Sequence, residues 1–152
     1  MMKRTILFII LLMALSAASG FLMSKASWIG RVGMTLFYKE YNLLKVWWQG
    51  GIAVFIVIMF LFFIHNLLYN KLPVIAAKFS HFILLLAAIA GFYITYLDFT
   101  DDFSHRMLGR RFHYGFYLAW IEWMLVCLFF LFKKKKKKIF AIDSNKTEPT
   151  VQ

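Results

Sequence analysis

The segment FYLAWIEWMLVCLFFLFKKKKKK, residues 116–138, decides the class of this protein. Its first part, Phe116 to Phe132, contains a single charged residue, Glu122, and is long enough to cross the hydrocarbon core of a bilayer. Six lysines, Lys133 to Lys138, follow immediately. A lysine block beside a span favours the cytoplasmic face, because anionic lipid and the positive-inside bias hold it there. The segment therefore predicts a transmembrane helix with a cytoplasmic C-terminal end.

Composition places the rest of the chain in the same class. Of 152 residues, 62% are hydrophobic and only 16% are charged, whereas a soluble domain has roughly 25% charged residues. The net charge of +11 would suggest nucleic acid as a partner of a soluble chain. Here the basic residues lie at the ends of apolar runs, where they meet phospholipid headgroups. We therefore expect the phospholipid bilayer, and not nucleic acid, to be the polyanionic partner.

The apolar residues are concentrated in four long runs, and none of the runs alternates apolar with polar residues as a barrel strand does. Helices are then the way to satisfy the backbone in lipid. We predict an all-α fold, an integral membrane bundle of four transmembrane helices, located in the cell (inner) membrane as a multi-pass protein. The predicted spans are about 5–23, 46–70, 79–97 and 112–132, within a membrane domain of residues 1–138. The polar residues 139–152 predict a disordered cytoplasmic tail.

The first run has two interpretations. Lys3 and Arg4, the apolar stretch and the small residues Ser16 to Ser19 also describe a signal peptide cleaved near Ala18. The apolar stretch continues through Met23, which is long for a signal peptide and suits a span. We favour a retained helix and leave cleavage open.

Basic residues predict the orientation. With both termini cytoplasmic, the inner segments hold 11 basic residues and the outer loops hold 7. This difference follows the positive-inside rule. We therefore predict that both termini are cytoplasmic.

The first outer loop, residues 24–45, is too long for a tight turn and too apolar for a free loop. Thr35, Lys39 and Asn42 fall on one face at helical spacing, with apolar side chains on the other. We predict a short interfacial helix there. It would pack across the bundle, or alternatively act as a docking surface for another membrane subunit or as a substrate lid.

Glu122 is a candidate functional residue, because it lies about ten positions from each end of the fourth run. A charged side chain at the centre of a span costs about 2.5–3.5 kcal/mol to insert, so this carboxyl should face the bundle or a partner. It could act as a proton relay or bind a cationic group. The structural alternative is a buried polar contact, in which a neutral carboxyl bonds Ser16, Tyr93 or a carbonyl, or a position nearer the membrane surface.

His65 and His81 are candidate ligands of a b-type haem. An antiparallel hairpin places the two histidines at similar depth, and two imidazoles from neighbouring helices can hold haem iron. The alternative is a pair of interfacial hydrogen-bonding groups, and the cofactor therefore stays unknown.

Acidic and basic residues cluster at the outer end of the bundle. Asp98, Asp101, Asp102 and His105 recur at helical spacing and are a candidate divalent-cation site. The alternative is a solvated loop in which Asp102 pairs with Arg106. Positive residues at both ends of the bundle are candidate contacts for anionic lipid; they are Arg110, Arg111, Lys133, Lys134 and Lys135.

Motifs for several activities are missing from the sequence. It has no CxxC pair, no glycine-rich phosphate loop and no HExxH, and its single cysteine, Cys127, suits packing. We expect a membrane protein without catalysis of its own, an accessory or interaction subunit of a membrane complex. The alternatives are a redox or proton-coupled component that uses Glu122, His65 and His81, and a protein that binds lipid or small molecules between its helices.

Overall fold

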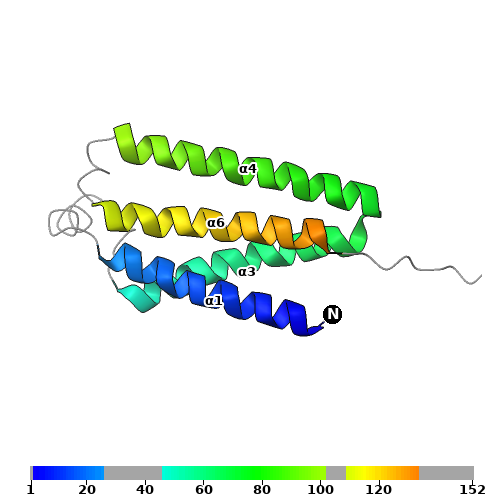
Figure 1. Ribbon diagram of the computed structural model, residues 1–152, viewed down its shortest axis with the longest axis horizontal. Helices are drawn as coiled ribbons and strands as arrows, with labels where there is room; N and C mark the ends of the chain where they lie inside the picture. Colours follow the sequence, from blue (N-terminus) through cyan, green and yellow to red (C-terminus); the bar gives the residue numbers. More distant parts are fainter. Residues whose placement is uncertain (1, 26–45, 102–108, 134–152) are drawn as a thin grey trace, which may run out of the picture.

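The chain forms four long α-helices in the computed structural model, which describes residues 2–25, 46–101 and 109–133. The helices, labelled as in Figure 1, are α1 (Met2–Ser24), α3 (Trp47–Lys71), α4 (Val74–Asp101) and α6 (Arg110–Phe132). Within these described ranges every element is helical. The all-α prediction is confirmed for them.

Each of the four helices is long and apolar enough to cross a membrane. The shortest two have 23 residues and the longest has 28, which corresponds to about 35 and 42 Å at 1.5 Å per residue. The hydrocarbon core of a bilayer is about 30 Å thick. The four apolar runs of the sequence thus correspond to four helices of membrane-spanning length.

Pro73 separates α3 from α4. Leu72 takes an extended conformation with φ −86° and ψ 152°, as the residue before a proline usually does. Its N–H still donates to the carbonyl of Leu68 at 3.1 Å, and the N–H of Ala77 donates to the carbonyl of Pro73 at 2.9 Å. One hydrogen bond thus closes each helix end within a very short turn, and α3 and α4 run antiparallel.

The helix α4 extends beyond the third predicted run, 79–97, at both ends. Lys78 defined the predicted start of that run, yet this lysine is exposed on the side of α4. A long lysine side chain can carry its charge towards water while its backbone remains helical. One charged residue near the end of an apolar run therefore does not mark the end of the helix.

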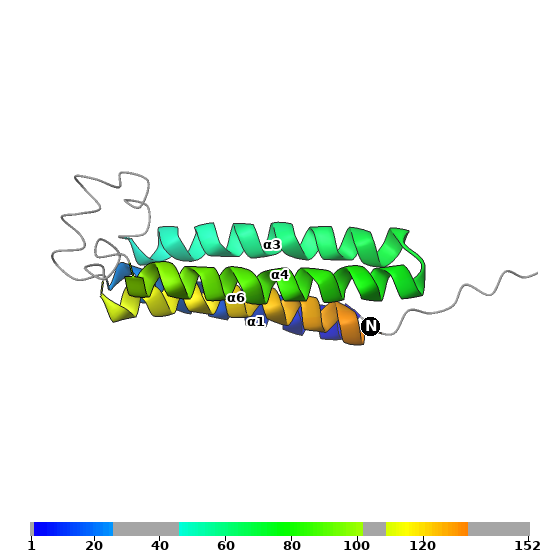
Figure 2. The same cartoon turned by 90° about the horizontal axis from the view of Figure 1, so that it is seen from above.

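The helix α6 lies in the middle of the bundle (Figure 1). It packs along α1 on one side and along α4 on the other, and it also touches α3. Figure 2 shows that the α3–α4 turn, the start of α1 and the end of α6 share one end of the bundle. In the most apolar stretch of α4 only 17% of the residues are buried, against 28% in each other helix. The outermost helix of the bundle is therefore α4.

Small residues let α1 and α3 approach each other closely. A Cβ atom added to Gly20 would overlap the backbone of Gly51, and one added to Gly51 would lie 3.3 Å from the Cα atom of Ala17. Contacts of this kind are common between membrane helices, because close van der Waals packing holds them together. The small residues that also fit a signal-peptide cleavage region thus include part of the surface by which α1 contacts α3.

Aromatic rings join α6 to its neighbours towards both ends of the bundle. Phe8 of α1 stacks on Phe129 of α6, with ring centroids 4.3 Å apart. At the opposite end, Phe99 of α4 and Phe112 of α6 are both buried, with centroids 6.4 Å apart. Such ring pairs add about 0.5–1.5 kcal/mol each beyond their buried area. They fix α6 in place, and Glu122 lies between the two clusters.

Two predicted features lie outside the described residues. They are the interfacial helix within residues 24–45 and the tail of residues 139–152.

Candidate functional site

Six polar side chains are buried inside the described helices: Ser16, Ser19, Ser24, His65, His81 and Glu122. Buried polar groups of this kind are costly in hydrocarbon unless they find partners. Two pairs among them contain titratable groups and come from different helices. These pairs, Ser16 with Glu122 and His65 with His81, form the candidate site.

Glu122 lies near the middle of α6 and is completely buried. The hydroxyl of Ser16 on α1 donates a hydrogen bond of 2.7 Å to its Oε2 atom. Among the described residues, the second oxygen, Oε1, has no hydrogen-bond partner. Of the partners considered from the sequence, Ser16 makes the contact, whereas the side chain of Tyr93 is 60% exposed on α4. The carboxyl therefore joins α6 to α1, and its Oε1 atom keeps a position that no described residue fills.

His65 and His81 face each other across α3 and α4. Their Nδ1 atoms are 2.8 Å apart, and their rings stack with centroids 5.0 Å apart. Both side chains are almost completely buried. The two residues lie eight positions before and eight positions after Pro73, so the turn brings them to the same level. The similar depth expected from the hairpin is confirmed.

The neighbours of His65 determine where the protons sit. The Nε2 atom of His65 lies 3.4 Å from the indole nitrogen of Trp123 and 3.5 Å from the sulfur of Cys127. An indole N–H only donates, so this Nε2 atom accepts, and neutral His65 carries its proton on Nδ1. That proton is donated to Nδ1 of His81, and neutral His81 then carries its own proton on Nε2. Nε2 of His81 has no partner among the described residues.

This geometry bears on the haem hypothesis for His65 and His81. Two axial imidazoles stand on opposite faces of the haem iron, whereas these two rings stack on each other and share a hydrogen bond. Phe130 also stacks against both rings, with centroids 5.8 and 5.4 Å away. Haem ligation would require the two rings to separate and Phe130 to move.

The predicted cation site at the outer end is described only in part. Asp98 is exposed on α4 and Asp101 is the last residue of that helix, whereas Asp102 and His105 lie outside the described residues. Within residues 2–25, 46–101 and 109–133, no three metal-ligating side chains gather.

Arg110 and Arg111 are exposed at the start of α6. Arg110 lines a groove of about 610 Å³ between the end of α4 and the start of α6, together with Tyr96, His113 and Tyr114. Hydroxyl, imidazole and guanidinium groups therefore meet at this end of the bundle. Such groups suit the polar region of a membrane surface better than its hydrocarbon core.

Lys133 lies just beyond the other end of α6, and its ammonium group is held over aromatic rings. The Nζ atom lies 4.6 Å from the ring centroid of Tyr69, 4.9 Å from that of Phe130 and 5.7 Å from that of Phe129. Cation–π attraction stabilises this arrangement, while burial lowers the pKa of Lys133. Lys134 and Lys135 lie outside the described residues.

We expect the Ser16–Glu122 hydrogen bond to couple α1 to α6 energetically. The free energy of unfolding in mixed micelles should be measured for Ser16→Ala, Glu122→Leu and the double variant. A coupling energy of about 1 kcal/mol is predicted, in the range found for hydrogen bonds between membrane helices. Ser19→Ala is the matched control, because Ser19 donates to the carbonyl of Gly115 at 2.6 Å instead. Equal coupling of Glu122 to Ser16 and to Ser19 would contradict the assignment.

Sequence reasoning missed the roles of Trp123 and Cys127. From the sequence, Trp123 had no assigned role and Cys127 was assigned to packing, yet both approach Nε2 of His65. Their spacing of four residues, which places both on one face of α6, was the available signal.

In comparisons with known proteins, no family model, no curated protein and no solved structure matches the chain.

Proposed function

We propose that this chain is an integral membrane protein of four transmembrane helices, without catalysis of its own, that serves as an accessory or interaction subunit of a membrane complex. Four helices of membrane-spanning length and apolar composition support the location. The observation that carries the proposal is what the six buried polar side chains contact. Five of the six hold helices to one another, and the hydroxyl of Ser24 donates to the carbonyl of Phe21 within α1.

The contacts of these five side chains each join two different helices. Ser16 and Ser19 tie α1 to α6, and His65 and His81 tie α3 to α4. Between α6 and α4, the indole N–H of Trp120 donates to Thr95 at 3.0 Å. Polar side chains used in this way serve assembly of the bundle. What the protein offers to other molecules is then its outward surface.

The outward surface is apolar, and α4 has the largest share of it. Phe79, Phe82, Leu86 and Ile89 are about half exposed or more on this helix. Of its neighbours, α4 packs mainly along α6, and it meets α3 much less. The exposed side of α4 is therefore the surface that we assign to a partner helix of another subunit.

The orientation belongs to the same proposal. We place the protein in the cell (inner) membrane with both termini in the cytoplasm, because the basic residues favour that side. The start of α1 and the end of α6 share one end of the bundle, which supports a common side for them (Figure 2). The predicted interfacial helix of the first outer loop would then lie at the opposite membrane surface.

Photo-crosslinking in intact cells tests the interaction surface. A photoreactive residue at Leu86 of α4, which is 50% exposed, should form a discrete protein adduct. The matched control is Val57 of α3, which is 56% exposed and at a similar depth, and it should form lipid adducts only. Identical products from both positions would contradict the assignment of α4.

A second candidate function is favoured by the contact between His65 and His81. Hydrogen bonds lead from Trp123 or Cys127 through both imidazoles to Nε2 of His81, which lacks a described partner. Glu122 also has an oxygen without one. Buried histidines and carboxyls within spans are typical of proton relays. On this alternative, the protein is a proton-coupled membrane component.

Proton flux in liposomes separates the two functions. If the relay operates, vesicles that contain the protein should dissipate an imposed pH gradient faster than empty vesicles, as followed with an entrapped pH-sensitive dye. His81→Phe should abolish this flux, because phenylalanine keeps a ring but cannot carry a proton. His113→Phe, at the other end of the bundle, is the control and should leave the flux unchanged. Identical rates in protein-containing and empty vesicles would eliminate the relay.

A further inference from the structure

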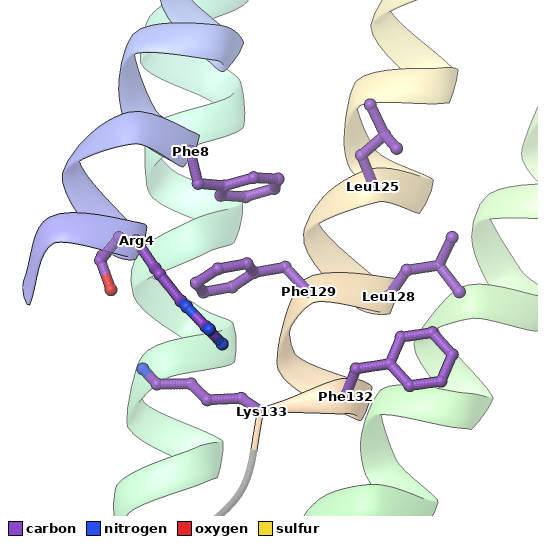
Figure 3. Close-up of a pocket in the computed structure, with 8 residues that line it drawn as sticks. Arg4, Phe8, Leu125, Leu128, Phe129, Phe132 and Lys133 are labelled. Atoms are coloured by element: carbon purple, nitrogen blue, oxygen red, sulfur yellow. The ribbon is translucent and has the colours of Figure 1, made fainter. Parts of the chain in front are cut away.

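Two cationic side chains extend into a groove between the start of α1 and the end of α6 (Figure 3). The groove has a volume of about 540 Å³, and its lining includes Arg4 and Phe8 from α1, Leu125, Leu128 and Phe129 from α6, and Lys133 just beyond α6. The figure shows both cationic side chains at the end of the groove, and Leu125 further along α6. The groove is therefore charged at one end and apolar along its length.

The charged end lacks an anion from the described chain. The acidic residues of the described helices are Asp98, Asp101 and Glu122. The two aspartates lie at the opposite end of α4, and Glu122 lies eleven positions before Lys133, about 16 Å along the helix axis. Arg4 and Lys133 thus create a local excess of positive charge. A ligand with a negative headgroup would complement it.

Three aromatic rings, those of Tyr69, Phe129 and Phe130, surround the ammonium group of Lys133. Its Nζ atom lies within 6 Å of three ring centroids, so the ammonium group is held beside Arg4 rather than extended freely into water. Partial burial of an ammonium group disfavours its charged form, whereas a neighbouring anion favours the charged form. An anionic group bound here would therefore interact with Lys133 more strongly than with a fully hydrated lysine.

The apolar part of the groove suits a hydrocarbon chain. The stacked rings of Phe8 and Phe129 form one wall, with an interplanar angle of 9°. Leu125 and Leu128 continue this wall, and Leu125 lies eight positions from Lys133, about 12 Å along α6. A free phosphate ion would use only the charged end. A phospholipid would use both parts.

We propose that an anionic phospholipid binds in this groove, with its phosphate between Arg4 and Lys133 and one acyl chain along Phe8, Phe129 and Leu125. The site rests on the proposed membrane location, and it adds a ligand class and a binding position to it. Anionic lipids are enriched in the cytoplasmic leaflet. This agrees with the side assigned to both termini.

Native mass spectrometry of the full chain, released from detergent, tests the proposal with phosphatidylglycerol as the probe. The wild-type chain should retain one phosphatidylglycerol molecule in preference to phosphatidylcholine. The Arg4→Gln/Lys133→Gln variant should bind phosphatidylglycerol about thirtyfold more weakly, because each basic residue near an anionic lipid contributes about fivefold in affinity and the two factors multiply. Helix content measured by circular dichroism should stay unchanged.

The charge-matched control is Lys71→Gln/Lys78→Gln, which removes two exposed lysines at the same end of the bundle. It should retain phosphatidylglycerol as the wild-type chain does. Equal weakening in both double variants, or no preference over phosphatidylcholine, would overturn the proposal. Displacement of the lipid by millimolar inorganic phosphate would also overturn it in favour of an ion site. A chain that leaves the membrane on carbonate washing would instead contradict the proposed location.

Discussion

Hydrocarbon contains no water to bond polar groups, and in the membrane location that we propose this constraint would shape the whole bundle. Helices satisfy their own backbone, so polar side chains within the spans must find partners on neighbouring helices. Ser16 and Glu122 meet between α1 and α6, and His65 and His81 meet between α3 and α4. The helix α6 lies in the middle of the bundle, packed along both α1 and α4 and also against α3 (Figure 1). The outward faces are left apolar, which suits helices that are long and apolar enough to cross a membrane.

Much of the architecture could be predicted from residue types and spacing. Four charge-poor runs correspond to four helices, since a run of about 20 apolar residues has few other stable forms. Pro73 lies midway between His65 and His81, and this symmetry was enough to predict their similar depth. Ser16 was a reasonable partner for Glu122, because both lie within apolar runs far from the run ends.

The rotation of each helix could not be predicted in the same way. These helices are apolar on all sides, so periodicity does not reveal which face turns inward. Close approach of Gly20 to Gly51 sets the α1–α3 contact, and ring packing around Phe129 sets the contact with α6. Both depend on shape rather than on polarity. For the same reason, the approach of Cys127 to His65 and the convergence of Arg4 with Lys133 became visible only in three dimensions.

The account depends on lipid surrounding the apolar faces while the polar pairs stay between helices. Spin labels placed singly at Phe82, Leu86 and Ala88 of α4, in a Cys127→Ala chain in liposomes, test this most directly through collision rates in electron paramagnetic resonance. Phe82 and Leu86 are about half exposed and Ala88 is completely buried. Labels at the two exposed positions should collide with oxygen dissolved in the lipid and not with an aqueous nickel chelate, and the label at Ala88 should collide with neither. Free access of the nickel chelate to Phe82 and Leu86 would contradict the account.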